Sequence, residues 1–452
     1  MGMIFSAQMS SQDLYSVLHL FFSWYLFHLQ LAKTHGNIFT LWFGWIPVIV
    51  LNGFQAVKDG MTTHPEDVSG RLLSPFFRGT PSGIILASGR SWKQQRRFGI
   101  MTLRNLGMGK KGLEHRVQEE ASHLVEIRVE PVDPSFPLFH SISNVICAVV
   151  FGYHFSDEDK TFHELIHATE NLFSTWCVSL LQMYEILPWL VSRLPGPHKK
   201  ALACYDVLSS FARKEIRRHI ERGMPAEPQD FIDFYLAEIE KVKGVKPKYD
   251  EENLVYVIND LFLGGSETSS TTLYWGLLYM VVNPHIQEKV QKELDAVLGP
   301  SQLICYEDRR KLPYTNAVVH EIQRFSNIVF ARVVGTESTV SSLQGTIVIP
   351  NIASVLYDPE QWETPRQFNP GHFLDKEGNF IPREAFLPFS AGKCHRVCLG
   401  EHLARTELFI FFANLLRAFT FRLPEGVTEI NTEPIFGGTL QPHPYRVCAI
   451  PR

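Results

Sequence analysis

Apolar residues recur at helical spacing through most of this chain, and that periodicity constrains its fold more than any other feature. Helices are predicted at 54–62, 90–104, 111–128, 139–150, 158–184, 199–222, 230–243, 251–283, 284–298, 313–326 and 400–417. Strand-like patterns are confined to 37–44, 47–53, 346–349 and the region 434–449. The 452 residues are enough for two domains, but no linker or repeat divides the chain. We therefore predict a mainly α protein with a small β region, built as a single large α-rich domain.

Composition excludes one class of partner and indicates the redox environment. The net charge is −4, so the sequence predicts no basic field of the kind that binds nucleic acid. The 7 cysteines are an odd number scattered along the chain, unlike a disulfide framework. A reducing, cytosol-facing environment is therefore predicted.

Two segments are candidates for contact with a membrane. The run 14–32 has no Asp, Glu, Lys or Arg and is close to the ~20 residues of a membrane span, but two histidines and a glutamine interrupt it. We interpret 1–32 as an N-terminal membrane-associated segment, either a true span or an amphipathic helix on a membrane or on the core. The Pro-bounded loop 188–200 is either a helix connection or a second membrane contact beside Lys199 and Lys200.

A loop near the C-terminus presents a cysteine directly before a predicted helix. Residues 389–400 read Phe-Ser-Ala-Gly-Lys-Cys-His-Arg-Val-Cys-Leu-Gly, and an amphipathic run follows. Backbone N–H groups and the helix N-terminus stabilise a negative charge on Cys398. A haem iron that cleaves dioxygen needs such a sheltered, charged sulfur as its axial ligand. This segment therefore predicts a haem-thiolate oxygenase.

The long helical pattern 251–283 contains Gly264-Gly265-Ser-Glu267-Thr268. Two glycines weaken a helix by about 1–2 kcal/mol, and the threonine hydroxyl can take a backbone carbonyl. A kink or widened turn here would leave room beside a metal for a diatomic ligand, with a carboxylate and a hydroxyl to relay protons. The alternative is a buried helix in which glycine allows close packing.

Two further pairs are weak signals on their own. Glu321 and Arg324 are three residues apart on one helix face, where most such pairs are solvated salt bridges. Trp92 and Arg96 are four residues apart, so an indole N–H and a guanidinium point the same way and can bind an anionic group such as a propionate. The alternative for this second pair is a basic helix with one packed tryptophan.

A competing hypothesis is a zinc hydrolase. His163, Glu164 and His167 match the His-Glu-x-x-His pattern of metalloproteases, and Glu185 follows at the distance of a third ligand. The alternative is a polar helix face. The hypothesis leaves the other motifs unexplained.

Taken together and in order, these motifs resemble the cytochrome P-450 monooxygenases over about 33–452. The resemblance includes Phe368-Asn-Pro-Gly-His372-Phe and is closest to the microsomal family 2, with the stretch 187–198 most like its J-type fatty-acid epoxygenases. It implies a cytochrome P-450 fold, a haem b cofactor, and roles for ten residues. Cys398 would be the axial iron ligand, Trp92, Arg96 and Arg396 would hold propionates, Phe389 would pack beside the sulfur, Glu267 and Thr268 would form the catalytic acid–alcohol pair, and Glu321, Arg324 and His372 would support the cysteine loop.

The resemblance also implies an activity and partners. It predicts an unspecific monooxygenase that inserts one oxygen atom from O2 into lipophilic substrates, such as arachidonic and other fatty acids or xenobiotics. Electrons would come from NADPH through a flavoprotein, NADPH–cytochrome P-450 reductase, near Lys393 and Arg396, with cytochrome b5 as a further candidate partner. The predicted location is the cytosolic face of the endoplasmic reticulum membrane, and segments 80–90, 259–268, 328–334 and 436–440 would line the substrate pocket.

The chain departs from the family pattern in two places. Phe389 and Cys398 are nine positions apart instead of seven, as if Cys394-His395 were inserted, and a hairpin near 342–345 is trimmed. Only Cys398, unlike Cys394, keeps register with Gly400. An alternative is therefore a degenerate, haem-poor relative with weak or no activity.

Overall fold

The computed structural model describes residues 6–7, 31–43, 46–71, 83–109, 111–125, 131–175, 184, 187–241, 249–299, 302–329, 334–335, 346–391 and 396–452. Its helices are α3 (Phe54–Thr62), α4 (Gly89–Asn105), α5 (Lys111–Leu124), α6 (Ser135–Val150), α7 (Lys160–Thr175), α9 (Pro188–Val191), α10 (Pro197–Arg222), α11 (Phe231–Lys241), α12 (Glu251–Val282), α13 (Pro284–Val297), η2 (Tyr306–Arg310), α14 (Pro313–Ser326), α15 (Ile352–Leu356), η3 (Pro370–Phe373) and α16 (Glu401–Ala418). The strands are β1 (Ser6–Ala7), β2 (Ile38–Phe43), β3 (Ile46–Leu51), β4 (Val334–Gly335), β5 (Ile347–Pro350), β6 (Phe419–Arg422), β7 (Pro434–Phe436), β8 (Leu440–Pro442) and β9 (Cys448–Pro451). The predicted mainly α architecture with a small β region is confirmed.

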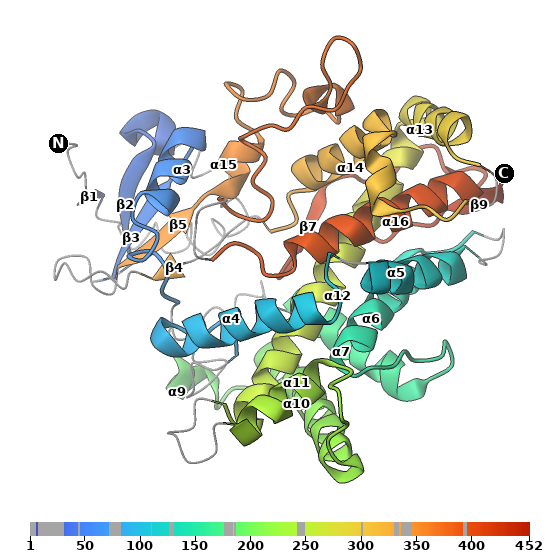
Figure 1. The fold of residues 1–452 in the computed structure, drawn as a ribbon. Coiled ribbons are helices and arrows are strands. Elements are labelled where there is room, and N and C mark those ends of the chain that lie inside the picture. Colours follow the sequence, from blue (N-terminus) through green and yellow to red (C-terminus); the bar gives the residue numbers. More distant parts are fainter. Residues whose placement is uncertain are drawn as a thin grey trace.

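The main sheet lies at one side of the molecule, at the left of Figure 1, and the large helices fill the other side. Its strand order is β1-β2-β3-β5-β4. β2 and β3 are antiparallel, with Ile38 opposite Leu51, while β3 and β5 are parallel, with Val48 opposite Ile347. The sheet thus joins the N-terminal region to a strand almost 300 residues later in the sequence. Two small pairs, β6–β9 and β7–β8, complete the β structure.

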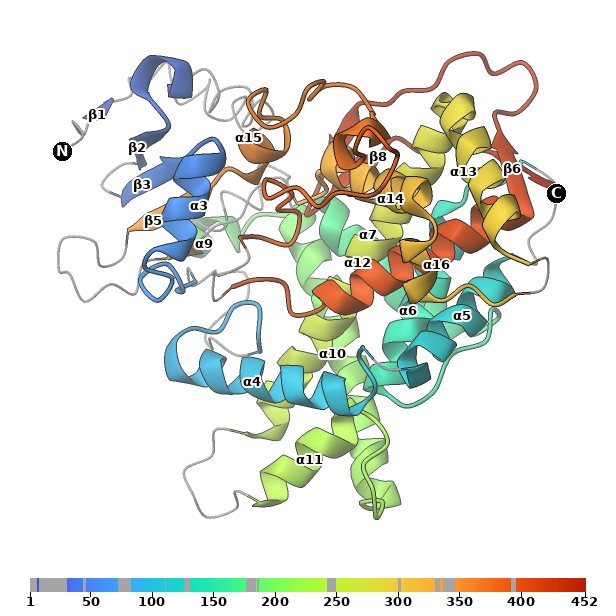
Figure 2. The same ribbon diagram turned by 45° about the horizontal axis from the view of Figure 1, so that its top comes forward.

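α12 passes through the middle of the helical part, with α6, α10, α14 and α16 packed around it (Figures 1 and 2). Most of its residues between Asn253 and Met280 are buried, so its apolar residues are not confined to one face. A Cβ at Gly265 would lie only 2.5 Å from Cδ1 of Ile146 on α6, so glycine is needed for this close approach. The close-packing interpretation of the glycines therefore holds for Gly265.

Two predicted features of the helices differ from the structure. α12 is helical throughout Glu251–Val282, so the Gly264-Gly265 pair does not break it. The helix predicted at 111–128 ends at Leu124. The helix predicted at 158–184 is described over Lys160–Thr175 (α7) and at Tyr184, while 176–183 lie outside the described residues, so its C-terminal end stays a prediction. Within the described part of the chain, no helix is both long and apolar enough to cross a membrane. Most of the predicted membrane segment, 8–30, lies outside that part.

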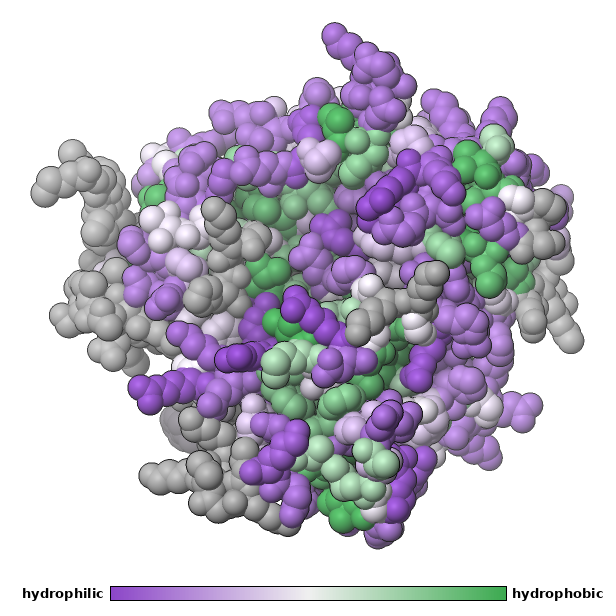
Figure 3. Space-filling model, viewed as in Figure 1, coloured by the Kyte–Doolittle hydropathy of each residue, from purple (hydrophilic) through white to green (hydrophobic). Residues whose placement is uncertain are grey.

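The surface is mixed in character. The face in Figure 3 is largely hydrophilic, while apolar residues gather in its lower half, where Figure 1 places α4, α10 and α11.

Candidate functional site

The loop before α16 presents Cys398 at its surface. The Cys398 side chain is exposed, and Gly400, two residues later, is the N-cap of α16. The backbone N–H of Cys398 donates to the carbonyl of Phe389 at 3.1 Å. This bond joins the two ends of the loop, Phe389 and Cys398. Residues 392–395, with Cys394 and His395, lie outside the described part.

The other end of the loop turns sharply. Ser390 is buried and has φ 85, a left-handed conformation that is unusual for a residue with a side chain. The ring of Phe389 lies 5.0 Å from the guanidinium carbon of Arg405 on α16. Phe389 therefore contacts Cys398 through its backbone, while its ring packs toward α16.

α4 packs against the cysteine loop and lies below it in the view of Figure 1. Arg96 Nη2 donates to the carbonyl of Val397 at 2.6 Å, and a Cβ at Gly99 would lie 3.4 Å from Leu399 Cδ1. The guanidinium of Arg396 stacks on Trp92, 3.7 Å from the ring centroid. The structure therefore brings Trp92, Arg96 and Arg396 together beside Cys398.

Arg396 is held by backbone carbonyls as well as by Trp92. It is 6% exposed and donates to Ser69 and Ala87 at 2.6 Å each and to Ile84 at 3.4 Å. A buried guanidinium with these acceptors is fixed in one orientation. Because it is buried, Arg396 does not contribute to the charged surface that was predicted to receive a reductase, and Lys393 lies outside the described residues.

Glu267 and Thr268 are neighbours on α12 but have different partners. The Glu267 carboxylate is 1% exposed. It accepts hydrogen bonds from Thr439, directly before β8, at 2.9 Å and from Gln441 in β8. Burial raises the pKa of Glu267 to about 7, and these hydrogen bonds oppose the rise. Thr268 Oγ1 donates to the carbonyl of Gly264 at 2.7 Å, as its sequence position predicted. In the described residues, no hydrogen bond joins the two side chains.

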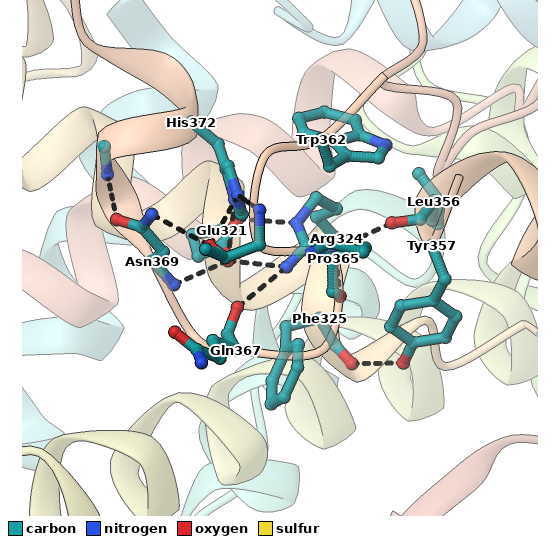
Figure 4. Close-up of polar contacts among 12 residues, drawn as sticks. Glu321, Arg324, Phe325, Leu356, Tyr357, Trp362, Pro365, Gln367, Asn369 and His372 are labelled. Atoms are coloured by element: carbon teal, nitrogen blue, oxygen red, sulfur yellow. Dashed lines mark hydrogen bonds and ion pairs between the residues drawn. The ribbon is translucent and has the colours of Figure 1, made fainter. Parts of the chain in front are cut away.

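Glu321 and Arg324 form a fully buried ion pair, which Figure 4 shows. Arg324 Nε and Nη2 each donate to the carboxylate of Glu321 at 2.7 Å. Arg324 also donates to the carbonyls of Leu356 (2.7 Å), Pro365 (2.9 Å) and Gln367 (3.1 Å), and His372 Nδ1 lies 3.3 Å from both oxygens of Glu321. The alternative of a solvated surface pair is therefore wrong.

The residues of the zinc motif do not form a metal site. On α7, His163 Nε2 lies 2.7 Å from the carbonyl of Asp157, and His167 Nδ1 lies 3.1 Å from Glu170. In the described residues, the one group with three metal-ligating atoms close together is buried His219, Asp230 and Asp233, far from this motif in sequence. Arg222 Nη2 lies 2.6 Å from Asp233 there and neutralises its charge. Glu185 lies outside the described residues.

The residues around Cys398 fit a haem. The thiol reaches the surface of the polypeptide, where an iron ligand must be. Trp92 is 2% exposed, yet no described residue accepts its indole N–H, which leaves that donor available to a propionate. The two guanidinium groups of Arg96 and Arg396 supply the charge that such a propionate requires.

Comparisons with known proteins agree with this geometry. The sequence pattern of the family described as Cytochrome P450 matches residues 17–449, and the chain belongs to this family. It is 42% identical to cytochrome P450 2J5 of Mus musculus over 435 residues, which cover 94% of this chain and 86% of that protein. It is 41% identical to cytochrome P450 2J2 of Homo sapiens (93% and 86% covered) and 39% identical to cytochrome P450 2C8 of Homo sapiens (93% and 88%). Proteins of this family bind haem and receive electrons from NADPH through a reductase.

The sequence reasoning missed two carboxyl groups near the site, half-buried Asp260 and buried Glu407. Asp260 on α12 accepts hydrogen bonds from the N–H groups of Ile84 and Ile85, and burial raises its pKa to about 7 against their effect. Glu407 on α16 accepts one from Ser269 Oγ at 2.8 Å, and burial raises its pKa to about 8. Each is a single charge within an apolar stretch of helix, and that signal was available in the sequence.

Proposed function

We propose that this protein is a membrane-associated monooxygenase in which Cys398 ligates a haem iron and one oxygen atom from O2 enters a lipophilic substrate, such as a fatty acid or a xenobiotic. The observation that carries the proposal is the exposed Cys398 on a loop closed at its base and braced by α4. The similarity to cytochromes P450 2J and 2C supports it. More specifically, we propose that the activity is that of an unspecific monooxygenase, which accepts several lipophilic substrates.

The residues around the loop have separate tasks in this mechanism. Haem supplies the activation of dioxygen when it is bound. In that case the Cys398 thiolate would be the iron ligand, and the Trp92 indole and the guanidinium groups of Arg96 and Arg396 would hold the propionates. The Thr268 hydroxyl and the Glu267 carboxyl would hold protons for the reaction, and the Glu267 pKa of about 7 keeps both of its protonation states populated near neutral pH. Glu321, Arg324 and His372 fix the segments that precede the cysteine loop.

The chain offers a matched pair of cysteines to test the iron ligand. The reduced protein with carbon monoxide should show the red-shifted Soret band that thiolate ligation produces. Cys398→Ser should abolish this band, while the control Cys394→Ser should keep it. Loss of the band only in Cys394→Ser would assign the other sulfur, and a band unaffected by either change would contradict thiolate ligation by this loop.

The surface of α4 supports electron entry from a reductase at this side. Its exposed residues include Arg90, Lys93, Arg97 and Arg104, and the helix has no acidic residue. These four basic residues lie on the same helix, α4, that contacts the cysteine loop. Charge reversal at Lys93 and Arg97 should raise the KM for the reductase at low salt and remove most of its salt dependence. Reversal of exposed Arg310, on η2, is the control and should change neither.

The loop before α10 supports a membrane contact and a location at the cytosolic face of the endoplasmic reticulum. Trp189 is 63% exposed, and Leu190 and Leu194 are 39% and 43% exposed beside it. Lys199 is exposed nearby and can meet anionic lipid. Brominated lipids in vesicles should quench the fluorescence of the protein, and Trp189→Phe should remove much of that quenching. Equal quenching of the variant would contradict this contact.

A further inference from the structure

Residues 83–88 lie between α12 and the cysteine loop and have almost no regular structure of their own. On one side, Asp260 Oδ2 accepts the N–H groups of Ile84 at 2.6 Å and Ile85 at 2.9 Å. Asn253, also on α12, accepts the N–H of Gly83 at 2.9 Å. The N–H groups of this segment are therefore bound by α12 side chains instead of by a helix or sheet.

The carbonyl groups of the same segment are bound from the opposite side. Arg396, two residues before Cys398, donates to the carbonyls of Ala87 at 2.6 Å and Ile84 at 3.4 Å. Arg71 Nε donates to the carbonyl of Ile85 at 3.1 Å. The segment is thus held between a carboxyl group on α12 and two guanidinium groups, one of which belongs to the cysteine loop.

This segment also approaches the turn of α12 that precedes Thr268. Ile85 is 44% exposed, and its Cδ1 lies 3.9 Å from the position of a Cβ at Gly264. Gly83 has φ 76, and a Cβ there would collide with the Asp260 carboxylate. The place of Ile85 beside Gly264 therefore depends on the contact between Asp260 and the backbone at 83–85.

We infer that Asp260 and Arg396 are positioning residues that act through residues 83–88, so that the pocket wall at Ile85 and the haem-binding loop at Cys398 are energetically coupled. Arg396 holds the same segment whose N–H groups Asp260 holds, and a change at either end alters the other. Coupling of this kind is reciprocal. Loss of the contact between Asp260 and this backbone should weaken haem retention, although Asp260 is not part of the cysteine loop. Loss of the Arg396 hydrogen bonds should speed exchange of the Ile84 and Ile85 amides, which Arg396 does not bind. The inference rests on the proposed function.

Hydrogen exchange and haem transfer test the two directions. In the purified holoenzyme at about pH 8, above the Asp260 pKa of about 7, Asp260→Asn should speed exchange of the Ile84 and Ile85 amides about ten-fold or more, since a charged acceptor is replaced by a neutral one. The same variant should transfer haem to apomyoglobin several-fold faster. Glu251→Gln changes an exposed acid at the start of the same helix and should alter neither rate.

Two other variants keep the test decisive. Gly83→Ala pushes the segment away from Asp260 without changing α12 and should reproduce both effects, so it serves if Asp260→Asn does not fold. Arg396→Lys keeps a positive charge but loses the planar guanidinium with its several N–H donors. This variant should raise the rate of hydrogen exchange of the Ile84 and Ile85 amides.

The outcomes separate this inference from the proposed function. Faster exchange without faster haem transfer, or unchanged exchange in both Asp260→Asn and Gly83→Ala, would overturn the coupling. If the wild-type protein lacks the red-shifted carbon monoxide band, the proposed function fails. The exchange rates in that protein then still decide whether Asp260 and Arg396 hold residues 83–88.

Discussion

Replacement of Arg324 by alanine should be among the most destabilising single changes in this chain. The substitution leaves the Glu321 carboxylate buried without its ion-pair partner, at zero exposure of both side chains. It also removes the hydrogen bonds that the Arg324 guanidinium donates to three backbone carbonyls in the segment 356–367. His372 remains 3.3 Å from Glu321 and offsets only part of the loss.

The size of the effect follows from these contacts. Breaking a buried ion pair from one side costs about 3–5 kcal/mol. Each carbonyl that stays unpaired adds about 1–3 kcal/mol, unless water reaches it. The free energy of unfolding should therefore fall by at least about 3–5 kcal/mol, a large part of the roughly 5–15 kcal/mol typical of folded proteins. At about 2.1 cal/mol/K of unfolding entropy per residue, a chain of 452 residues loses roughly 1 °C of Tm per kcal/mol.

Glu307 and Arg310 offer a matched control because they have the same spacing and chemistry at the surface. Their ion pair spans 3.1 Å, and the side chains are 62% and 74% exposed. Arg310→Ala should cost about 0–1 kcal/mol. Urea unfolding followed by tryptophan fluorescence, with haem content measured on the same samples, compares the two variants. Equal losses of stability in Arg324→Ala and Arg310→Ala would refute the reasoning.

Three other changes have defined expectations. The raised pKa of Glu407, about 8, means that its stabilising contribution is complete below about pH 4.5 and is lost as pH rises to about 8, so Glu407→Gln should reduce by about 2–3 kcal/mol the loss of stability between pH 6 and pH 9 in urea unfolding. Gly265→Val should cost about 1–3 kcal/mol by overpacking against Ile146, measured by the same unfolding assay against Gly112→Val, at an exposed glycine of α5 whose Cβ position has no atom within 4 Å. Ile85→Ala should broaden the distribution of oxidation products more than it changes their total amount, and an unchanged distribution on chromatography would contradict a place for Ile85 in the pocket wall.

Helix positions were predictable because they depend on local pattern. α14 begins and ends where the sequence predicted, since Pro313 at the first turn and apolar periodicity both act within the helix. α3 and α12 likewise agree within one residue at each end. The short elements α15 and η3 were missed, because they are shorter than the window over which periodicity can be recognised.

The partners of the site residues were less predictable, because most of them lie far away in the sequence. The burial of Glu321 and Arg324 depends on carbonyls at 356–367, and an isolated pair three residues apart gives no sign of it. Glu267 is held by Thr439, 172 residues later. Arg396 binds backbone carbonyls, and a carbonyl acceptor has no sequence signature because every residue has one.

The structure bears on how the lengthened cysteine loop affects haem binding. The Cys398 N–H bond to Phe389 fixes the base of the loop, and Arg96 holds the carbonyl of Val397 directly before the cysteine. Arg396 is held by Trp92 and three carbonyls, so the positions next to the sulfur have contacts that do not involve 392–395. We therefore expect deletion of Cys394 and His395 to leave the haem content per chain unchanged. A haem-poor wild type whose content rises on deletion would instead support the degenerate relative, because the additional residues would then be shown to displace the sulfur in spite of these contacts.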